Sequence, residues 1–233
     1  MPAETLIAQI GLYLLYILLP LLALYIGYLI ITKAFHDMGF SSIEAIIIVF
    51  VSFLLGSGIV DGYAGITFSN IHLFDYGKWQ VGINIGGAVI PLLLCIYLII
   101  KNKIPLLRVA IGIVIVAVIT FFVTHPDPQK GIISSFPFWL FPAVAASIVS
   151  LFLLWRTKKK AAPLAYISGV VGVLIGADVF HLFTLLQNEL TTSRNAIIGG
   201  ANVFDMVFIT GILAVILDGI LTFGQKKEKQ NTP

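Results

Sequence analysis

Charge is what this sequence has least of: Asp, Glu, Lys and Arg make up only 11% of its 233 residues. Soluble domains carry about 25% charged residues, so this scarcity excludes the ordinary soluble class. Cysteine is also scarce: Cys95 is the only one in the sequence, so no intrachain disulfide forms. No basic residue precedes the first apolar run, which argues for a retained membrane helix and against a cleaved signal peptide. No basic patch with interleaved aromatic residues is present, so we expect no nucleic-acid partner.

Long apolar runs are what the chain has instead, because 59% of its residues are hydrophobic and the charges fall in short clusters. A run of about 20 apolar residues crosses a bilayer as a helix, and these runs lack the alternation of a membrane barrel. The sequence therefore predicts an all-α, polytopic membrane protein, with residues 1–233 as a single transmembrane domain and 223–233 as a basic cytoplasmic tail. Seven transmembrane helices are expected, at 6–31, 43–60, 81–100, 109–124, 137–155, 163–187 and 200–222.

The basic residues predict how these helices are oriented. With the N-terminus outside, 11 of the 14 Lys and Arg residues fall on the cytoplasmic side and 3 fall outside. Cytoplasmic segments carry an excess of Lys and Arg, so this bias places the N-terminus outside and the C-terminus in the cytoplasm. The tryptophans agree with an aromatic belt, since Trp79 and Trp139 open spans at the outer face and Trp155 closes one at the inner face.

Polar side chains interrupt the apolar runs mainly in the outer half of the membrane. Asp178 lies about 5 Å outward of the centre of its helix, and Asp205 lies about 9 Å outward in the next helix, at 1.5 Å per residue. An ionisable group at such a depth is costly, so both aspartates are candidate site residues. Four further polar residues are expected to support them from the same half: Asn84, His181, Asn202 and Asp61.

Each candidate also has a structural interpretation. Asp178 lies in the middle of its helix, where it caps no end, so a functional role is favoured. Asn202 and Asp205 have the spacing of a capping box, and this role is compatible with a site. His181 lies three residues after Asp178, where it either tunes the carboxylate or makes an ordinary hydrogen bond, and the second interpretation is favoured. We expect no metal and no cofactor.

A weak internal repeat accompanies these residues. LLGSGIVDG, which contains Asp61, resembles VLIGADV around Asp178, and both belong to helices that run outward. GINIGGAVIP around Asn84 resembles GGANVFDM around Asn202, and both of these helices run inward. The pattern is typical of a 3+1+3 arrangement of parallel repeats, as in some transporters.

Three stretches that cover most of the chain, VGINIGGAVIPLLL, PLAYISGVVGVLIGADVFHL and IIGGANVFDMVFITGILAVIL, together resemble a family of polytopic membrane proteins from bacteria and archaea. That family carries a domain-of-unknown-function label. The resemblance implies a prokaryotic source, and hence the cell membrane as the location, and it implies no activity.

A second, local resemblance concerns the two aspartates. ADVFHLF around Asp178 is similar to the YD-containing helix of presenilins and signal peptide peptidases, and FDMVFITGILA around Asp205 is similar to their GxGD helix. The resemblance implies that Asp178 and Asp205 are a catalytic pair. The chain departs from that family at Ala177, where the family has tyrosine, and at residues 202–204, where it has GxG. It also lacks a PAL motif and has seven predicted helices in place of nine.

Three functions are therefore open. The leading hypothesis is an intramembrane aspartyl protease-like protein in which Asp178 and Asp205 share one proton and cleave a transmembrane peptide. The alternative is a proton- or cation-coupled transporter of a small solute that uses the same acidic cluster, because the same electrostatics serves both. The third is a non-catalytic membrane scaffold. The bilayer is the one certain partner, and the sequence leaves the oligomeric state open.

Overall fold

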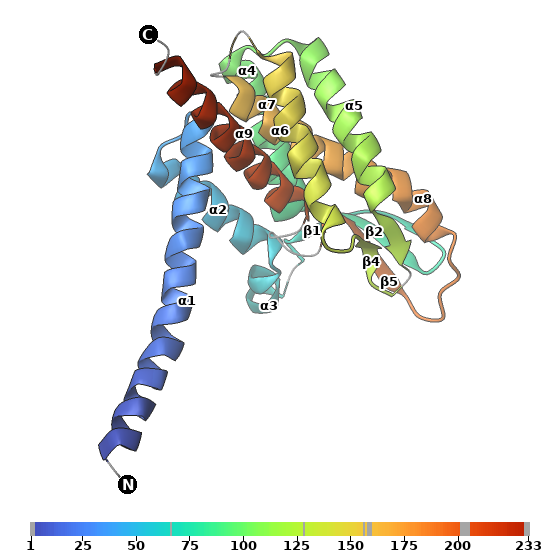
Figure 1. Ribbon diagram of the computed structural model, residues 1–233. Helices are drawn as coiled ribbons and strands as arrows, with labels where there is room; N and C mark the ends of the chain where they lie inside the picture. The colour runs from blue at the N-terminus through green and yellow to red at the C-terminus, as the bar shows by residue number, and fades with distance from the viewer. Residues whose placement is uncertain are drawn as a thin grey trace.

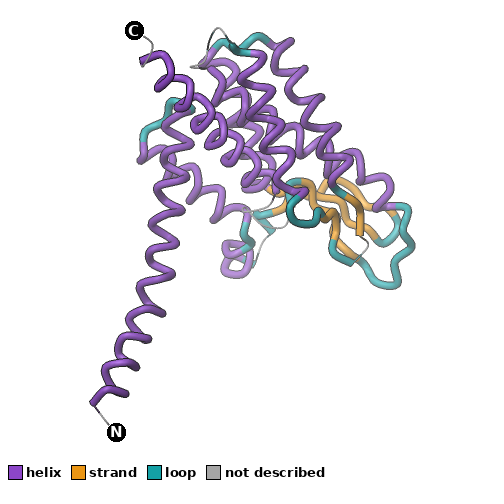
Figure 2. Tube along the Cα trace, in the orientation of Figure 1, coloured by secondary structure: helices purple, strands orange, loops and turns teal. Residues whose placement is uncertain are grey.

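The computed structural model describes residues 3–65, 67–127, 129–155, 157, 160–200 and 206–230. Most of these residues are helical, and the helices form a bundle with a small β-sheet packed at one end (Figures 1 and 2). The helices of the bundle are α4 (Ile90–Asn102), α5 (Leu106–Val123), α6 (Phe141–Leu153), α7 (Ala161–Val173) and α9 (Met206–Gln230). Two further helices, α1 (Ala3–Asp37) and α2 (Ser42–Gly56), lie beside the bundle.

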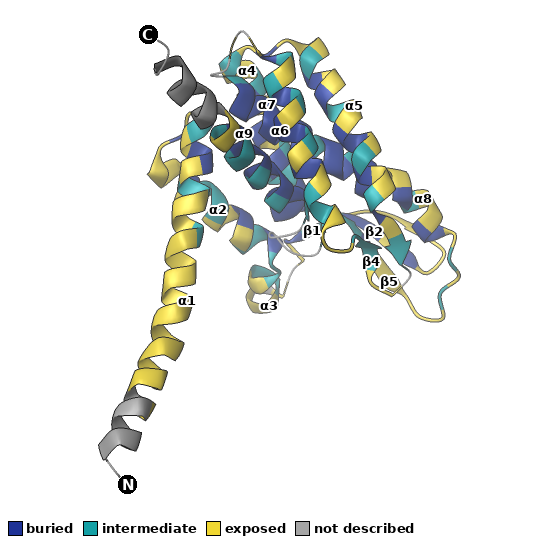
Figure 3. Cartoon of the chain, viewed as in Figure 1, coloured by how far each residue is buried: buried dark blue, intermediate teal, exposed yellow. Residues whose placement is uncertain are grey.

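Helix α7 forms the centre of the bundle and contacts α4, α5, α6 and α9. Nearly every residue of α7 is buried, including Leu164, Tyr166, Ile167 and Val170 at 0% exposure (Figure 3). A helix that is apolar on all faces is stable only when neighbours cover all of them, and this is the position that α7 takes. The sequence of α7 thus accounts for its central place.

Within the described residues, four helical segments are long and apolar enough to cross a membrane: Gly11–Asp37, Ile85–Asn102, Leu106–Val123 and Ala161–Leu186. Three shorter apolar helices accompany them, at Ser42–Gly56, Phe138–Leu153 and Met206–Leu221. Each of the seven predicted ranges overlaps one of these segments. The large apolar side chains that α1 and α5 expose are consistent with lipid-facing surfaces, so the prediction of a polytopic membrane protein agrees with the fold.

The prediction of an entirely helical chain needs a correction, because the described part of the chain contains five strands. Strands β1 (Asn70–Tyr76), β2 (Trp79–Asn84) and β5 (Arg194–Ile198) form one sheet in the order β1-β2-β5. β1 and β2 are antiparallel and joined by a two-residue turn in which Gly77 has φ of +60°, whereas β2 and β5 are parallel. Strands β3 (His125–Asp127) and β4 (Gly131–Ile133) form a separate hairpin.

The sheet changes the third predicted helix. Residues 81–84, which were expected to open a helix at 81, are the end of β2. A five-residue π-helix, η1 (Ile85–Val89), follows, and α4 begins at Ile90. The error has a simple cause: Val81-Gly82-Ile83 is as apolar as a membrane helix, and hydropathy does not distinguish a short buried strand from the first turn of a helix.

Helix α1 stands apart from the other helices. Its last residues, together with those that follow, are buried against the bundle, with Ala34 and Phe35 at 0% and Met38 at 1% exposure. Its contacts are with α2, α7 and α9. Away from this end α1 diverges from the bundle, and its side chains there are exposed (Figure 3).

The two stretches that suggested an internal repeat differ in conformation. LLGSGIVDG includes the end of α2 and a break at Ser57-Gly58, after which a short helix, α3 (Ile59–Ala64), begins. VLIGADV passes without a break from α7 through a π-helix, η4 (Leu174–Val179), into α8 (Phe180–Leu186). The structure describes the part around Asn84 but not residues 201–205, so the second half of the comparison lies outside the described residues.

Candidate functional site

Asp178 lies in η4, the π-helical turn that joins α7 to α8. A π-turn inserts an extra residue into a helix and is frequent at functional sites. The side chain is buried, with 8% exposure. Its Oδ2 accepts a hydrogen bond from the backbone N–H of Gly199, just after β5, at 2.6 Å. This hydrogen bond holds the Asp178 carboxylate against the chain that leaves β5.

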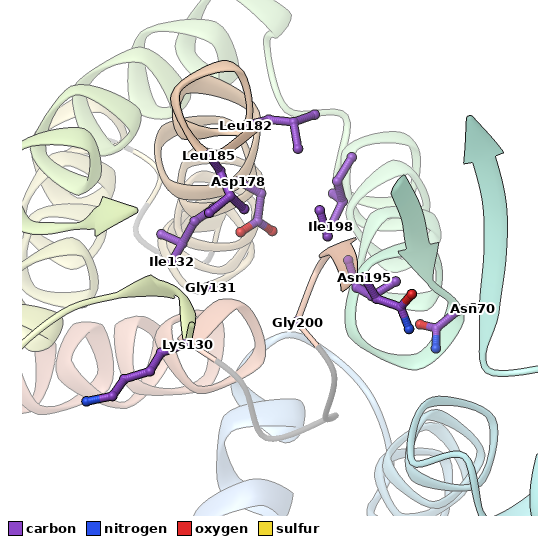
Figure 4. A pocket seen from close by; sticks show the side chains of 12 residues that line it. Asn70, Lys130, Gly131, Ile132, Asp178, Leu182, Leu185, Asn195, Ile198 and Gly200 are labelled. Carbon is purple, nitrogen blue, oxygen red and sulfur yellow. The ribbon is translucent and has the colours of Figure 1, made fainter. Parts of the chain in front are cut away.

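A pocket of about 310 Å³ opens beside this carboxylate. Its walls come from η4 and α8 on one side, β5 on another, and the β3–β4 hairpin on a third. The Asp178 carboxylate projects into the open space, and Asn70 and Asn195 lie together on the sheet side (Figure 4). Lys130 also lines the pocket, but its side chain extends away from Asp178. The pocket therefore presents a carboxylate and two carboxamides among aliphatic side chains.

Gly199 is held in place by close backbone packing. Its φ is +83°, and a Cβ at this position would lie 2.5 Å from the Cβ of Ala88 in η1. A Cβ on Gly87 would in turn collide with the carbonyl oxygen of Gly199. Only glycine accommodates both the left-handed conformation and the contact. The donor that Asp178 uses is thus fixed against the π-helix η1.

Asn84 precedes η1 and is fully buried, with 0% exposure. Its Oδ1 accepts from the N–H of Gly87 at 2.7 Å, which caps η1. Its Nδ2 donates to the carbonyl of Gly56, at the end of α2, and to Oδ1 of Asn70, each at 3.0 Å. The predicted supporting residue Asn84 therefore joins α2, η1 and β1, and it positions Asn70 on the pocket wall.

Asp61, the second supporting residue, lies in α3 and fastens the chain that leads into β1. Its carboxylate accepts from the N–H groups of Phe68, at 2.7 Å, and Ser69, at 2.9 Å, and also from the Ser69 hydroxyl. The hydrogen bond from the Ser69 hydroxyl is the main cause that lowers the pKa of Asp61, and the two backbone donors add to it. Since Nδ2 of Asn70 donates to Ser69 at 3.1 Å, Asp61 is connected through Ser69 and Asn70 to Asn84.

The glycines that precede Asp178 bring α7 and η4 close to α5, as their spacing predicts. A Cβ on Gly172 would lie 2.6 Å from Val116 of α5, and one on Gly176 would collide with the backbone of Ala117. This contact leaves no room for a side chain on that face, so η4 lies directly against α5. Asp178, two residues after Gly176, contacts Gly199 and the pocket.

His181 does not line the pocket with Asp178. Its ring stacks on Phe121 of α5 at 4.6 Å, with 12° between the planes, and Nε2 lies 3.2 Å from the Phe121 carbonyl. This contact is what the favoured interpretation of His181 predicts, and the role of the residue stays a prediction. The sequence argument assumed α-helical spacing, whereas the π-turn at residues 174–179 changes the angle between side chains three residues apart.

Asp205 and Asn202, the remaining candidates, lie outside the described residues, so the pairing of Asp178 with Asp205 stays a prediction. Gly200, which lines the pocket, and Met206, which begins α9, are the described residues on either side of that segment. Among the described residues, no group of three or more His, Cys, Asp or Glu side chains is arranged to hold a metal ion.

Sequence reasoning missed Asn70, Asn195 and Lys130, which belong to strands or to the hairpin beside the pocket. The sequence does contain a signal for the strand that carries Asn70. Residues 70–84 read as two short strands around Gly77-Lys78, and a two-residue turn with glycine between such segments predicts a β-hairpin. No comparable signal marks Asn195, because the parallel pairing of β5 with β2 joins segments more than 100 residues apart.

Residues 63–217 match a family model whose description is "Protein of unknown function (DUF1614)". This match covers more than half of the chain and confirms the predicted resemblance to a family with a domain-of-unknown-function label. No significant match was found among curated proteins or solved structures. The local resemblance to presenilins and signal peptide peptidases therefore gains no support from the comparisons.

Proposed function

The chain belongs to the DUF1614 family, and from the pocket beside Asp178 we propose that it is a proton- or cation-coupled transporter of a small solute. The observation that carries the proposal is the Asp178 carboxylate, which is buried, held by the Gly199 N–H and directed into a polar pocket. An ionisable residue within an apolar membrane segment that faces a solvated cavity is the usual feature of a substrate or ion pathway.

The pocket chemistry favours a solute with a cationic or hydrogen-donating group. Asp178 supplies a negative charge, and Asn70 and Asn195 supply carbonyl acceptors and amide donors opposite it. A volume of about 310 Å³ lies at the lower end of small-molecule sites, which span roughly 300–1,000 Å³. When the solute leaves, the same carboxylate would bind a proton, and this exchange would couple the two fluxes.

We further propose the topology that the sequence predicts: seven spans in a prokaryotic cell membrane, with the N-terminus outside. The 11 basic residues assigned to the cytoplasmic side support it. In this orientation the sheet and the pocket face outward, so solute would enter from outside. The 3+1+3 parallel repeat that the sequence suggests also remains part of the proposal.

A screen for stabilising solutes tests the proposal. Purified protein is heated with a panel of small amines, amino acids and inorganic cations, and the shift in Tm is measured for wild type, Asp178→Asn and Asp75→Asn. Asp75 is an exposed control in β1. We expect a solute that raises the Tm of wild type and Asp75→Asn but not of Asp178→Asn. Uptake of that solute into proteoliposomes should rise with an imposed proton or cation gradient. A shift that is equal in all three proteins, or no flux across the panel, would contradict the proposal.

One observation favours a second candidate, the intramembrane aspartyl protease. Strand β5 lies at the edge of its sheet, pairs only with β2 among the described strands, and lines the pocket next to Asp178. An edge strand binds an extended peptide by adding it to the sheet. A peptide strand on β5 would run past Asp178, and Asp205 belongs to the segment between Gly200 and Met206 that follows β5.

Peptide cleavage separates the two candidates. Transmembrane peptides are incubated with wild type, Asp178→Asn and Asp205→Asn in detergent and in liposomes, and products are identified by mass spectrometry. The protease requires cleavage by wild type and none by either variant, because each aspartate is needed for one shared proton. Identical products from wild type and Asp205→Asn would remove this candidate. If Asp178→Asn and Asp205→Asn each change the Tm but alter neither solute binding nor peptide cleavage, the protein is a non-catalytic scaffold.

A further inference from the structure

An apolar groove of about 400 Å³ lies between α2 and α4, and it shares no described lining residue with the pocket beside Asp178. Phe40 and Leu94 are buried members of its lining, whereas Ile47 and Leu93 are more than half exposed. Both helices belong to the apolar segments that are expected to lie in the membrane, so we expect the exposed side chains to face lipid. The groove is therefore open to lipid tails along its sides.

Two side chains of opposite charge lie at one end of this groove, where α2 begins and α4 ends. Glu44 belongs to the lining itself. The Lys101 ammonium lies 4.8 Å from the ring centre of Phe40 and 5.2 Å from that of Tyr97, which are the two aromatic residues of the lining. Lys101 is also close enough to Glu44 for the two charges to attract. The groove is therefore apolar along its length and has a positive and a negative group at one end.

Both charged groups are held in place by the protein and keep hydrogen-bonding capacity for a ligand. Nζ of Lys101 donates to the carbonyl of Gly39 at 2.9 Å, which uses one of the three ammonium hydrogens. Oε2 of Glu44 accepts from the N–H and the hydroxyl of Ser41, at 2.7 Å and 2.9 Å, within the capping box of α2. A carboxylate has a second oxygen for a further donor. The loop before α2 thus fixes the spacing of the two charges.

From these features we propose that the groove binds a zwitterionic phospholipid with a primary ammonium group, of the phosphatidylethanolamine type. One acyl chain lies along the apolar lining, the phosphate pairs with Lys101, and the headgroup ammonium donates to Glu44. Lipid tails are all about equally apolar, so the chain contributes packing and does not select one lipid over another. The preference comes from the headgroup, because charge-assisted hydrogen bonds are the stronger and more directional ones.

The pair of charges disfavours the other occupants. An anionic phospholipid without an ammonium brings its phosphate to Lys101 but also close to Glu44, which repels it. Phosphatidylcholine carries a trimethylated ammonium that has no N–H to donate to the carboxylate. An apolar helix from a second protein would cover both charges without offering them hydrogen bonds, and burying charged groups in this way is costly. The complementary ligand has one phosphate and one ammonium hydrogen-bond donor.

Thermal stabilisation by defined lipids tests the proposal. Purified wild-type protein in detergent receives phosphatidylethanolamine, phosphatidylcholine or phosphatidylglycerol with identical oleoyl chains, and an apparent affinity is obtained from the rise in Tm with lipid concentration. We expect phosphatidylethanolamine to bind at least about fivefold more tightly than either of the other lipids. Equal affinities for the three lipids, or a preference for phosphatidylcholine or phosphatidylglycerol, would overturn the proposal.

Charge-neutralising variants assign the preference to the groove. Lys101→Gln removes the positive charge, and Glu44→Gln removes the negative charge but keeps an oxygen that accepts from Ser41. Each should reduce the preference for phosphatidylethanolamine to less than about twofold. The matched control is Lys103→Gln, which removes a positive charge just beyond the end of α4 and should keep the preference. A preference that survives in both groove variants, or that the control also loses, would contradict the assignment.

Photo-crosslinking locates the lipid on the wild-type protein, so this measurement depends on no variant. Phosphatidylethanolamine with a diazirine in one acyl chain is irradiated with the protein in liposomes, and labelled peptides are identified by mass spectrometry. We expect labelling near Ile47 and Leu93 to exceed labelling near Val114 of α5 at least about fivefold, although Leu93 and Val114 are similarly exposed, at 59% and 60%. Equal labelling of α5 would overturn the proposal. The proposed transport function does not depend on this result, because the Asp178 pocket lies elsewhere.

Discussion

The π-turns η1 and η4 place a polar side chain on each side of the same backbone contact, yet in opposite situations. Asn84, before η1, is fully buried and uses both amide hydrogens and its oxygen in hydrogen bonds to Gly56, Asn70 and Gly87. Asp178, within η4, is held by Gly199 and borders a pocket. A buried polar group whose hydrogen bonds are all made within the protein stabilises the fold, whereas a carboxyl group that borders a cavity is also positioned to contact a ligand.

This comparison depends on the contact between η1 and Gly199, so breaking that contact should have the largest effect. Gly199→Ala introduces a Cβ 2.5 Å from that of Ala88 and imposes a left-handed φ on alanine. Strain and overpacking together should lower the free energy of unfolding by about 3–5 kcal/mol. The control is Gly77→Ala, where φ is also positive but nothing lies within 4 Å, and the loss should be about 1 kcal/mol. Denaturant titration in detergent measures both, and equal losses would show that the contact is unimportant.

Next in size is the difference in stability between variants of the two polar residues. Asn84→Ala removes three hydrogen bonds and leaves buried partners unpaired, which should cost about 2–4 kcal/mol. Asp178→Asn keeps an oxygen that accepts from Gly199, so its cost should be under about 1 kcal/mol. The same titration measures both variants. If Asp178→Asn were the more destabilising of the two, Asp178 would be a structural residue like Asn84, and the functional interpretation would fail.

A smaller effect concerns the pocket wall opposite Asp178. Asn195→Ala removes a carboxamide that faces the pocket and should weaken solute binding about tenfold, or about 1.4 kcal/mol. Lys130→Ala should change affinity less than about twofold, because the side chain extends away from Asp178. Equilibrium binding of the solute that the Tm screen identifies provides the test. A larger loss for Lys130→Ala than for Asn195→Ala would place the solute on the other side of the pocket.

The smallest expected effect is a pH dependence at Asp61, which shares the hydrogen-bond network of Asn84. Its pKa is lowered in the folded protein, mainly by the Ser69 hydroxyl. A lowered pKa contributes stability that is fully present above the unfolded value of 3.8 and is lost as pH falls through the folded pKa. Unfolding measured from about pH 6 to pH 3 should therefore show less acid destabilisation in Asp61→Asn than in wild type. If the free energy of unfolding falls equally with pH in wild type and Asp61→Asn, the hydrogen bonds of Asp61 do not contribute to stability.

Hydropathy was sufficient to predict the helices, because a membrane helix must satisfy its own backbone and so needs a long apolar run. The predicted range 163–187 contains most of α7. The strands were missed because Val81-Gly82-Ile83 has the same hydropathy as a helix, and because β2 and β5 pair across more than 100 residues. Long-range pairing of this kind leaves no local periodicity in the sequence.

The candidate site was predicted only in part for the same reason. Asp178 was identified from the cost of a charge in an apolar run, and Asn84 and Asp61 from their depth. The pocket itself depends on Asn70 and Asn195, which are ordinary polar residues in strands and become notable only when the sheet is assembled. The angle between Asp178 and His181 was misjudged, because no simple sequence pattern distinguishes a π-turn from an α-helix.

The most direct measurement is the affinity of the stabilising solute for wild type, Asp178→Asn and Asp75→Asn, determined by equilibrium binding at neutral pH. Asp178→Asn should bind at least about 100-fold more weakly, since hydrogen bonds to a charged group contribute roughly 1.5–3 kcal/mol and the charge attraction is lost as well. Asp75→Asn should bind as wild type does. Equal affinity in all three proteins would contradict the account, because the buried carboxylate would then take no part in binding.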